Sequence, residues 1–124
     1  MRTPKSILVV DDNSSMRMCM KRLLSKHGYN VALFDSGVAL LSRGDFSDAL
    51  CVIIDINLHD QSGIDLRRQL ADKGVRLPVI FITGNDSDAN RSAAIEAGCI
   101  AYLSKPFAAR SLIEAVERAL MEIF

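Results

Sequence analysis

The sequence predicts a single α/β domain, residues 1–124, in which a doubly wound, five-stranded parallel sheet is covered by helices on both faces. Five short runs of apolar residues, rich in β-branched side chains, are typical of strands buried on both faces. A segment with helical spacing of its apolar residues follows each run, which predicts right-handed β-α-β connections and a parallel sheet. The length of 124 residues suits one domain with its own hydrophobic core.

The first two strands are predicted at residues 6–10 and 29–34, where short apolar runs occur. Between them, apolar residues recur at helical spacing over residues 16–27, after polar residues that can cap a helix. Gly28 can end this helix, because glycine readily adopts the left-handed conformation found just after a helix. A short helix is expected at residues 38–41, after the second strand.

The third strand is predicted at residues 50–55, where an apolar run ends abruptly in a carboxylate. Periodicity alone would also allow a short buried helix segment here. A helix with apolar side chains at positions 64, 66 and 70 follows. The fourth strand, residues 79–83, is opened by Pro78, which is tolerated because a first strand residue need not donate to the sheet.

The last two helices differ in how firmly they are expected to pack. A helix over residues 88–97 is rich in alanine and has Ile95 as its only large apolar residue, which predicts weak anchoring. The fifth strand is predicted at residues 100–104. A clearly amphipathic helix follows, with apolar residues from Leu112 to Ile123.

Composition excludes several classes of function for this chain. Fifteen basic and fifteen acidic residues cancel, so no net charge attracts nucleic acid or a membrane surface. The apolar runs are far too short to span a membrane, and the first residues lack the apolar core of a signal peptide. We therefore expect a cytoplasmic protein without direct nucleic-acid or membrane binding.

The three cysteines are widely spaced along the chain. Metal ligation needs closer clustering, and a disulfide framework needs an even number in a secreted chain. We expect Cys19, Cys51 and Cys99 to be buried small apolar residues.

Carboxylates follow two of the predicted strands and are expected to meet. The flavodoxin-like strand order 2-1-3-4-5 places the first and third strands side by side, so Asp11, Asp12 and Asp55 share one edge of the sheet. Each contacting pair of carboxylates repels by roughly 4 kcal/mol at an effective dielectric constant near 20. Such a cluster holds protons at raised pKa or binds a cation, and oxygen ligands of this kind suit Mg²⁺. The alternative is that each Asp only caps the helix that follows it.

A hydroxyl and an ammonium group are expected at the same edge. Thr83 ends the fourth strand and Lys105 follows the fifth, where the neighbouring Pro106 holds its backbone extended. A cation, a lysine and a threonine around one carboxylate form a phosphoryl-binding arrangement. The carboxylate of Asp55 can then act as the nucleophile and form an aspartyl phosphate.

Several short motifs occur in a fixed order along the chain. They are Asp11-Asp12 after residues 7–10, Asp55 after residues 52–54, Gly63, Thr83-Gly84, Ala97-Gly98 and Lys105-Pro106-Phe107. In this order and spacing, over essentially the whole chain, they resemble the response-regulator receiver domains of bacterial two-component signalling. Thr83-Gly84 and Ala97-Gly98 are most similar to receivers attached to helix-turn-helix transcription effectors.

The resemblance implies a role for each residue of the site. Asp55 is implied as the acceptor of a phosphoryl group from a histidine kinase or a histidine phosphotransfer protein. Asp12 is implied as a direct Mg²⁺ ligand with Asp55, Asn57 as a ligand through its backbone carbonyl, and Asp11 as a ligand through a bound water. Lys105 is implied as the counter-charge of the phosphate. Such a domain catalyses only its own phosphorylation and dephosphorylation and is not otherwise an enzyme.

The same resemblance implies how the signal leaves the site. The hydroxyl of Thr83 and the ring of Tyr102 are expected to form a coupled switch, unless Tyr102 is ordinary strand packing. The side chains of Asn57 and Asn85 are expected to tune the lifetime of the phosphoryl group. The output face is expected on the fourth helix, fifth strand and fifth helix, where an output domain, a target protein or a phosphorylation-dependent dimer partner binds. His59 stands where such domains usually carry proline, which puts the rigidity of that loop in doubt.

Three alternatives are less consistent with these residues. A receiver-like interaction module that works without phosphorylation would be expected to lose Asp55, Thr83 or Lys105, and all three are present. An aspartate-nucleophile phosphohydrolase needs an acidic residue two positions after its nucleophile, where this chain has Asn13 and Asn57. A flavin or nucleotide carrier would need a phosphate-binding loop after the first strand, and the acidic residues there have the wrong charge.

Overall fold

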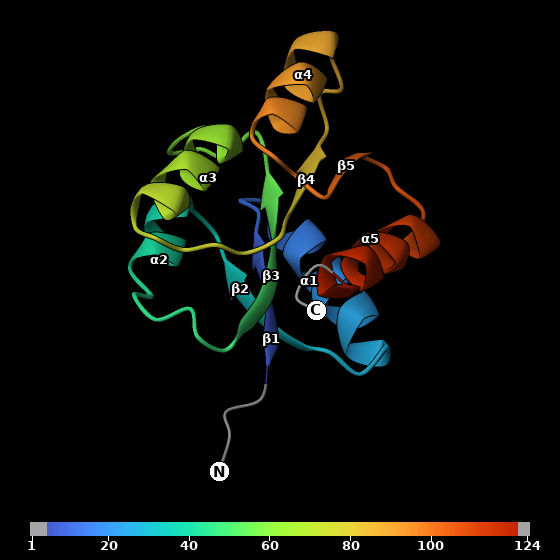
Figure 1. Ribbon diagram of the computed structural model, residues 1–124. Helices are drawn as coiled ribbons and strands as arrows, with labels where there is room; N and C mark the ends of the chain where they lie inside the picture. The colour runs from blue at the N-terminus through green and yellow to red at the C-terminus, as the bar shows by residue number, and fades with distance from the viewer. Residues whose placement is uncertain (1–4, 122–124) are drawn as a thin grey trace.

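The computed structural model describes residues 5–121 and shows the predicted α/β sandwich (Figure 1). Its strands are β1 (Ser6–Val10), β2 (Asn30–Phe34), β3 (Ala49–Asp55), β4 (Val79–Thr83) and β5 (Ala101–Ser104). Its helices are α1 (Ser14–Lys26), α2 (Gly37–Leu41), α3 (Gly63–Asp72), α4 (Asp88–Glu96) and α5 (Ala109–Met121). Every predicted element is present. Ile123, the last apolar residue predicted for the final helix, lies outside the described residues.

The five strands form one parallel sheet in the order β2-β1-β3-β4-β5, which confirms the predicted topology. The register brings the ends of neighbouring strands level with one another. Val10 of β1 pairs with Ile54 of β3, so Asp11 and Asp55 come next to each other at the carboxyl edge. Thr83 of β4 pairs with Ser104 of β5, so Lys105 follows at the same edge.

The sheet is buried on both faces because alternate strand residues point to opposite sides. Ile7 and Val9 of β1 pack in one core with residues of α1 and α5. Leu8 and Val10 pack in a second core with residues of α2, α3 and α4. Figure 1 shows α1 and α5 together on one side of the sheet and α2 and α3 on the other. This double burial explains why the strands are runs of apolar residues.

The helix α4 is weakly anchored, as the sequence predicted. Its buried residue is Ala94, whereas Ile95 is 66% exposed. Small side chains bury little apolar area, and the stabilisation gained from packing grows with the area buried. This helix therefore contributes less to the core than α3 or α5. None of the helices between residues 5 and 121 is long and apolar enough to cross a membrane.

The prediction that all three cysteines are buried is wrong for Cys19. Cys51 is fully buried in β3, and burial raises the pKa of its thiol to about 12. Cys99 is half-buried, and Cys19 is exposed on α1. The buried residues of α1 are Met20 and Leu24. One residue along a helix turns the side chain by about 100°, which takes Cys19 off the face that carries Met20.

We expect Gly63→Ala to lower the free energy of unfolding by about 1–3 kcal/mol, the usual range for overpacking a core. A Cβ atom at Gly63 would lie 2.4 Å from the backbone oxygen of Asp55 and 2.7 Å from a methyl carbon of Ile54. Urea unfolding measures the loss. Gly84→Ala is the matched control, because a Cβ atom there meets nothing within 4 Å. Equal stability of the two variants would contradict the predicted clash.

Candidate functional site

The three carboxylates predicted to meet at the sheet edge do so. Asp11, Asp12 and Asp55 each offer an oxygen atom, and these atoms lie within 4.8 Å of one another. Asp11 is fully buried and Asp55 is 5% exposed, whereas Asp12 is half-buried. The oxygen Oδ1 of Asp55 accepts a hydrogen bond of 2.9 Å from the backbone N–H of Asn57. Because buried carboxylates lose most of their hydration, this cluster needs positive charge from the protein or from a bound cation.

Lys105 supplies part of that charge. Its Nζ donates to Asp11 Oδ2 and to Asp55 Oδ2, both at 2.9 Å. The lysine side chain is 18% exposed, so these bonds lie largely out of water. Lys105 comes directly after β5, and its peptide bond to Pro106 is cis. Lys105 and Asp55 are 50 residues apart in the chain and are brought together only by the sheet.

Burial and neighbouring charge alter the protonation of the site. Burial raises the pKa of Asp55 above its ordinary value, and the charge of Asp11 adds to the rise. Hydrogen bonds from Asn57 and Lys105 act in the opposite direction without cancelling it. Burial by itself would lower the pKa of Lys105, but its bonds to Asp11 and Asp55 raise it. The ammonium therefore stays charged, and among residues 5–121 it is the one Lys or Arg side chain that forms an ion pair with any of the three carboxylates.

This donor set fits a hard divalent cation. Carboxylate oxygens are the ligands that Mg²⁺ prefers, and the negative charge exceeds what Lys105 can balance. A bound cation would relieve the repulsion between the acids. Asp12 is the most exposed of the three and lies on the solvent side of the cluster, where an ion would enter.

Thr83 lies fully buried at the end of β4 and connects two asparagines. Its Oγ1 accepts from the side-chain amide of Asn57 at 3.1 Å and from the backbone N–H of Asn85 at 3.0 Å. A hydroxyl that accepts from two groups still has its own proton to donate. The structure thus brings together Thr83, Asn57 and Asn85, but Asn85 takes part here through its backbone.

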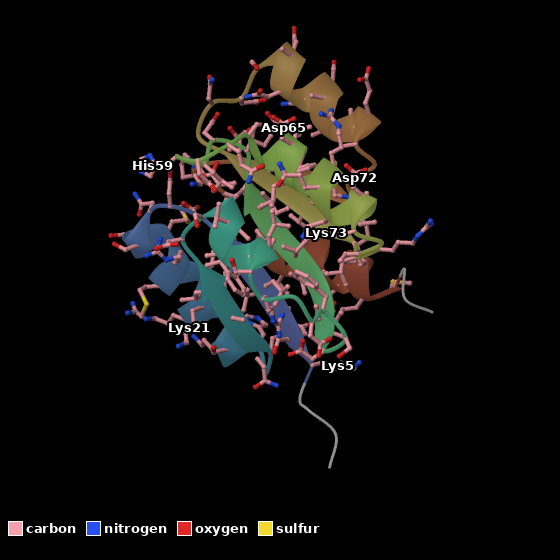
Figure 2. The ribbon with its side chains drawn as sticks, turned by 90° about the vertical axis from the view of Figure 1, so that its left-hand side faces the viewer. Lys5, Lys21, His59, Asp65, Asp72 and Lys73 are labelled. Carbon is pink, nitrogen blue, oxygen red and sulfur yellow. The ribbon has the colours of Figure 1, made fainter. Side chains whose placement is uncertain are left out.

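The loop after β3, residues 56–62, is called the acceptor loop below. The N–H of Gly63 donates to the carbonyl of Ile56 at 2.7 Å, and Asn57 and Ser62 form an antiparallel bridge that closes the base of the loop. Nearer the tip, the carboxylate of Asp60 accepts hydrogen bonds from α2. The loop is therefore held by hydrogen bonds, although it has His59 in place of the usual proline. The His59 side chain is 88% exposed, with Nε2 3.3 Å from Asp12 Oδ2, and Figure 2 shows it at the edge of the molecule.

A family model described as the response regulator receiver domain matches residues 7–117. The chain belongs to this family. The response regulator protein TmoT of Ectopseudomonas mendocina is 33% identical over 114 residues, which are 92% of this chain and 52% of TmoT. The response regulator MprA of Mycobacterium avium (strain 104) is 39% identical over 109 residues, 86% of this chain and 47% of MprA. This receiver domain therefore spans about half the length of the curated relatives it matches.

Solved receiver structures share the fold. A crystal structure of FixJ-N has a TM-score of 0.89 at 29% sequence identity and covers 99% of this chain and 98% of its own. A CheY-like receiver domain protein from Methanospirillum hungatei JF-1 has a TM-score of 0.87 at 28% identity, over 97% of this chain and 96% of its own. The predicted family and fold are confirmed by these comparisons.

Tyr102 of this receiver domain is held by two residues that sequence reasoning missed. Its hydroxyl donates to Asp86 Oδ1 at 3.1 Å, and the guanidinium of Arg91 lies 5.2 Å from the centre of its ring. Arg91 also donates to both carboxylate oxygens of Asp86, at 3.0 and 2.8 Å. Asp86 lies in the loop after Thr83 and Arg91 lies in α4. The spacing of five residues between them matches no helical pair, so no sequence pattern indicated this cluster.

We expect Asp55→Asn to raise the free energy of unfolding of the metal-free receiver domain at neutral pH. The folded-state pKa of Asp55 is raised, so ionising this carboxyl costs folding free energy. The cost is present above the raised folded-state pKa and disappears below the unfolded-state value, close to 3.8. Urea unfolding with a chelator, at neutral pH and at a pH below 3.8, measures the change in the free energy of unfolding.

The control for this prediction is Asp72→Asn, which removes the same charge from the exposed end of α3. It should leave the stability nearly unchanged at both pH values. A variant Asp55→Asn that is no more stable than the native domain at neutral pH would show that the acid cluster is already balanced by Lys105.

Proposed function

We propose that this receiver domain takes a phosphoryl group from a histidine kinase or a histidine phosphotransfer protein onto Asp55, with Mg²⁺, and that this changes the face formed by α4, β5 and α5. The observation that carries the proposal is the pairing of Lys105 Nζ with Asp11 and Asp55 beside the buried hydroxyl of Thr83. Buried acids that repel one another destabilise a fold. Their presence is explained if they bind a metal ion and a phosphoryl group.

Four residues of the chain would hold the metal ion. Asp12 and Asp55 would bind through their carboxylates, Asn57 through its backbone carbonyl, and Asp11 through a bound water. When bound, Mg²⁺ supplies positive charge to the phosphoryl oxygens and weakens their repulsion with the acceptor carboxylate. Asp11 and Asp12 directly follow β1, Asp55 ends β3 and Asn57 lies in the acceptor loop, so the sheet register sets the spacing of the site.

The transfer is a displacement at phosphorus. A carboxylate oxygen of Asp55 forms a bond to phosphorus while the bond from phosphorus to the donor imidazole nitrogen breaks. The other ring nitrogen of the donor carries a proton, so the imidazole leaves as the neutral molecule. Lys105 lies 2.9 Å from Asp55 Oδ2 and is placed to pair with a phosphoryl oxygen in the transition state and in the product. By this proposal the domain catalyses its own phosphorylation and dephosphorylation, and Asn57 and Asn85 influence how long the phosphoryl group lasts.

Thr83 is the group that would sense the phosphoryl oxygens. Its hydroxyl proton remains free to donate, and a hydrogen bond to a charged acceptor contributes about 1.5–3 kcal/mol. The Thr83 hydroxyl accepts a hydrogen bond of 3.1 Å from the Asn57 side-chain amide in the unphosphorylated domain. Moving Thr83 toward Asp55 would strain or break this hydrogen bond. It also pulls on Asn85, whose N–H donates to the same oxygen and which starts the loop to α4.

Tyr102 then has to leave Asp86 and Arg91 if its ring is to move toward Thr83. The Asp86 carboxylate has a lowered pKa, chiefly because Arg91 and Ser104 donate to it, so it is charged at neutral pH. A weakly packed α4 needs only a few kcal/mol of bias to change position. The rearranged α4–β5–α5 face would bind an output domain, a target protein or a second phosphorylated copy. We further propose a cytoplasmic protein whose output domain regulates transcription.

We expect acetyl phosphate with Mg²⁺ to add one phosphoryl group to the native domain and none to Asp55→Asn. The adduct should be hydroxylamine-sensitive, because an acyl phosphate is attacked by that nucleophile. Intact mass spectrometry measures the adduct. In Asp12→Ala, labelling should require far more Mg²⁺, because a direct ligand of the metal is lost.

The paired outcomes separate the competing functions. Labelling of Asp55→Asn at the native rate would place the acceptor elsewhere. No labelling of the native domain by acetyl phosphate or by any phosphorylated donor would favour an interaction module that works without phosphate. Equal Mg²⁺ affinity of Asp12→Ala and the native domain would remove Asp12 from the metal site.

We expect Thr83→Val to separate the site from the output face. Beryllofluoride, which stands in for the phosphoryl group, should shift the amide resonances of residues 84–105 as well as those of the site. In Thr83→Val the shifts near Asp55 should persist, while those of Tyr102 and α4 should fall to a small fraction, because the hydroxyl that links them is gone.

Thr83→Ser is the matched control, since it keeps the hydroxyl and removes only a methyl group. It should retain the shifts at Tyr102 and α4. If these distal shifts persist undiminished in Thr83→Val, then Thr83 does not transmit the signal.

A further inference from the structure

The tip of the acceptor loop (residues 56–62) is held by α2, an element to which the proposed function assigns no role. The two carboxylate oxygens of Asp60 accept from two successive backbone N–H groups of α2. Oδ1 accepts from Gly37 at 3.2 Å and Oδ2 accepts from Val38 at 3.0 Å. Burial opposes the charge of Asp60, but the bonds from Val38 and Gly37 outweigh it and lower the pKa of this carboxyl. Asp60 is therefore ionised and bound to α2 at neutral pH.

The next residue packs against the same turn of α2. A Cβ atom added at Gly37 would lie 2.5 Å from Nε2 of Gln61 and 3.0 Å from its Cδ. Gly37 does not have a positive φ, so its backbone would accept alanine, but the new methyl group would push the amide end of Gln61 away from its present position. The Oε1 atom of Gln61 is buried and has no hydrogen-bond partner among the described residues. The Gln61 side chain thus packs against α2, although this leaves its Oε1 atom without a hydrogen bond.

The base of the loop is fixed on β3 at the same time. Gly63 lies so close to β3 that a Cβ atom would lie 2.4 Å from the Asp55 carbonyl oxygen. Asn57, whose carbonyl belongs to the proposed metal site, bridges to Ser62. The loop is consequently held at its base by β3 and at its tip by α2. Asn57 lies only three positions before Asp60, so the contact with α2 adds a second restraint on the segment that carries the Asn57 carbonyl.

We infer that Asp60 and Gln61 are positioning residues that hold the acceptor loop on α2 in the geometry that Mg²⁺ binding at Asp55 and Asn57 requires. The inference rests on the proposed function and adds a second group of residues to it. Mg²⁺ demands nearly ideal octahedral geometry at short ligand distances, so a displaced carbonyl weakens binding sharply. Asp60 and Gln61 are not assigned as ligands of the metal or of the phosphoryl group. Their effect is that of outer contacts that orient a ligand.

The main test compares Asp60→Ala with the native domain in a Mg²⁺ titration followed by amide resonances. The dissociation constant should rise on the order of tenfold, the lower end of the usual effect of losing an outer contact of a metal ligand. Asp60→Asn keeps one acceptor oxygen and should give a smaller rise. Asp72→Ala removes the same charge at the carboxyl end of α3, whereas the acceptor loop leads into its amino end (Figure 2). It should leave the Mg²⁺ dissociation constant unchanged.

A second set of variants reaches the same loop through Gln61. Gly37→Ala should raise the Mg²⁺ dissociation constant because the new methyl group displaces the Gln61 side chain. The double variant Gly37→Ala with Gln61→Ala removes the clash and should return to the value of Gln61→Ala alone. An unchanged constant in Gly37→Ala would contradict the role of Gln61.

Hydrogen exchange in the metal-free domain distinguishes positioning from general stability. In Asp60→Ala the amides of Gly37, Val38 and Asn57 should exchange faster, while amides of β1 and β3 keep their protection. If Asp60→Ala loses affinity only in proportion to a global loss of protection, then positioning is excluded.

The positioning role of Asp60 and the proposed function of the domain would be contradicted by different results. A native domain that binds Mg²⁺ and is phosphorylated at Asp55, together with an Asp60→Ala variant of equal affinity, overturns the positioning role and leaves the proposed function intact. A native domain that binds no Mg²⁺ overturns both. A selective loss of affinity with local exchange supports the inference.

Discussion

The hydrogen bonds from Lys105 to Asp11 and Asp55 are the interaction on which the rest of the site depends. They join the ends of β1, β3 and β5, three strands that are far apart in the sequence. The ammonium stabilises two buried carboxylates that would otherwise repel each other without compensation. It also prepares the acceptor for an anionic group, because a cation already lies within hydrogen-bonding distance of it. Under the proposed function, the stability of this sheet edge and the reactivity of Asp55 would therefore have the same physical origin.

The compensation of charge at the site is incomplete, and under the proposed function this would allow the receiver domain to respond. One ammonium balances one of three carboxylates, and the pKa of Asp55 remains raised by burial. Such a site gains free energy from any arrangement that brings in more positive charge or spreads the negative charge over hydrogen-bond donors. Under the proposed function, a divalent cation would bring in positive charge, and a phosphoryl group paired with Lys105, Thr83 and the cation would spread the negative charge. The binding free energy would then be available to move the surroundings of the site.

Two connections lead away from the acceptor, and they differ in strength. Thr83 leads through Asn85 toward α4, where few contacts resist movement and where Asp86 and Arg91 hold Tyr102 in its present position. The acceptor loop leads to α2 through Asp60, where paired hydrogen bonds resist movement. The proposed function needs both connections, because the metal ligands would have to stay in place while the output face changes.

The five strands, their order and the polar residues at one sheet edge could be predicted before the fold was known: Asp11, Asp55, Thr83 and Lys105. The strands follow from local patterns, and their order follows the common flavodoxin-like arrangement with right-handed connections. Three features could be seen only in the folded chain: Asp60 binds α2, Asp86 holds Tyr102, and Cys19 faces solvent. Such contacts depend on loop paths and side-chain directions, and residues separated by 16 or 23 positions carry no periodic signal of their meeting.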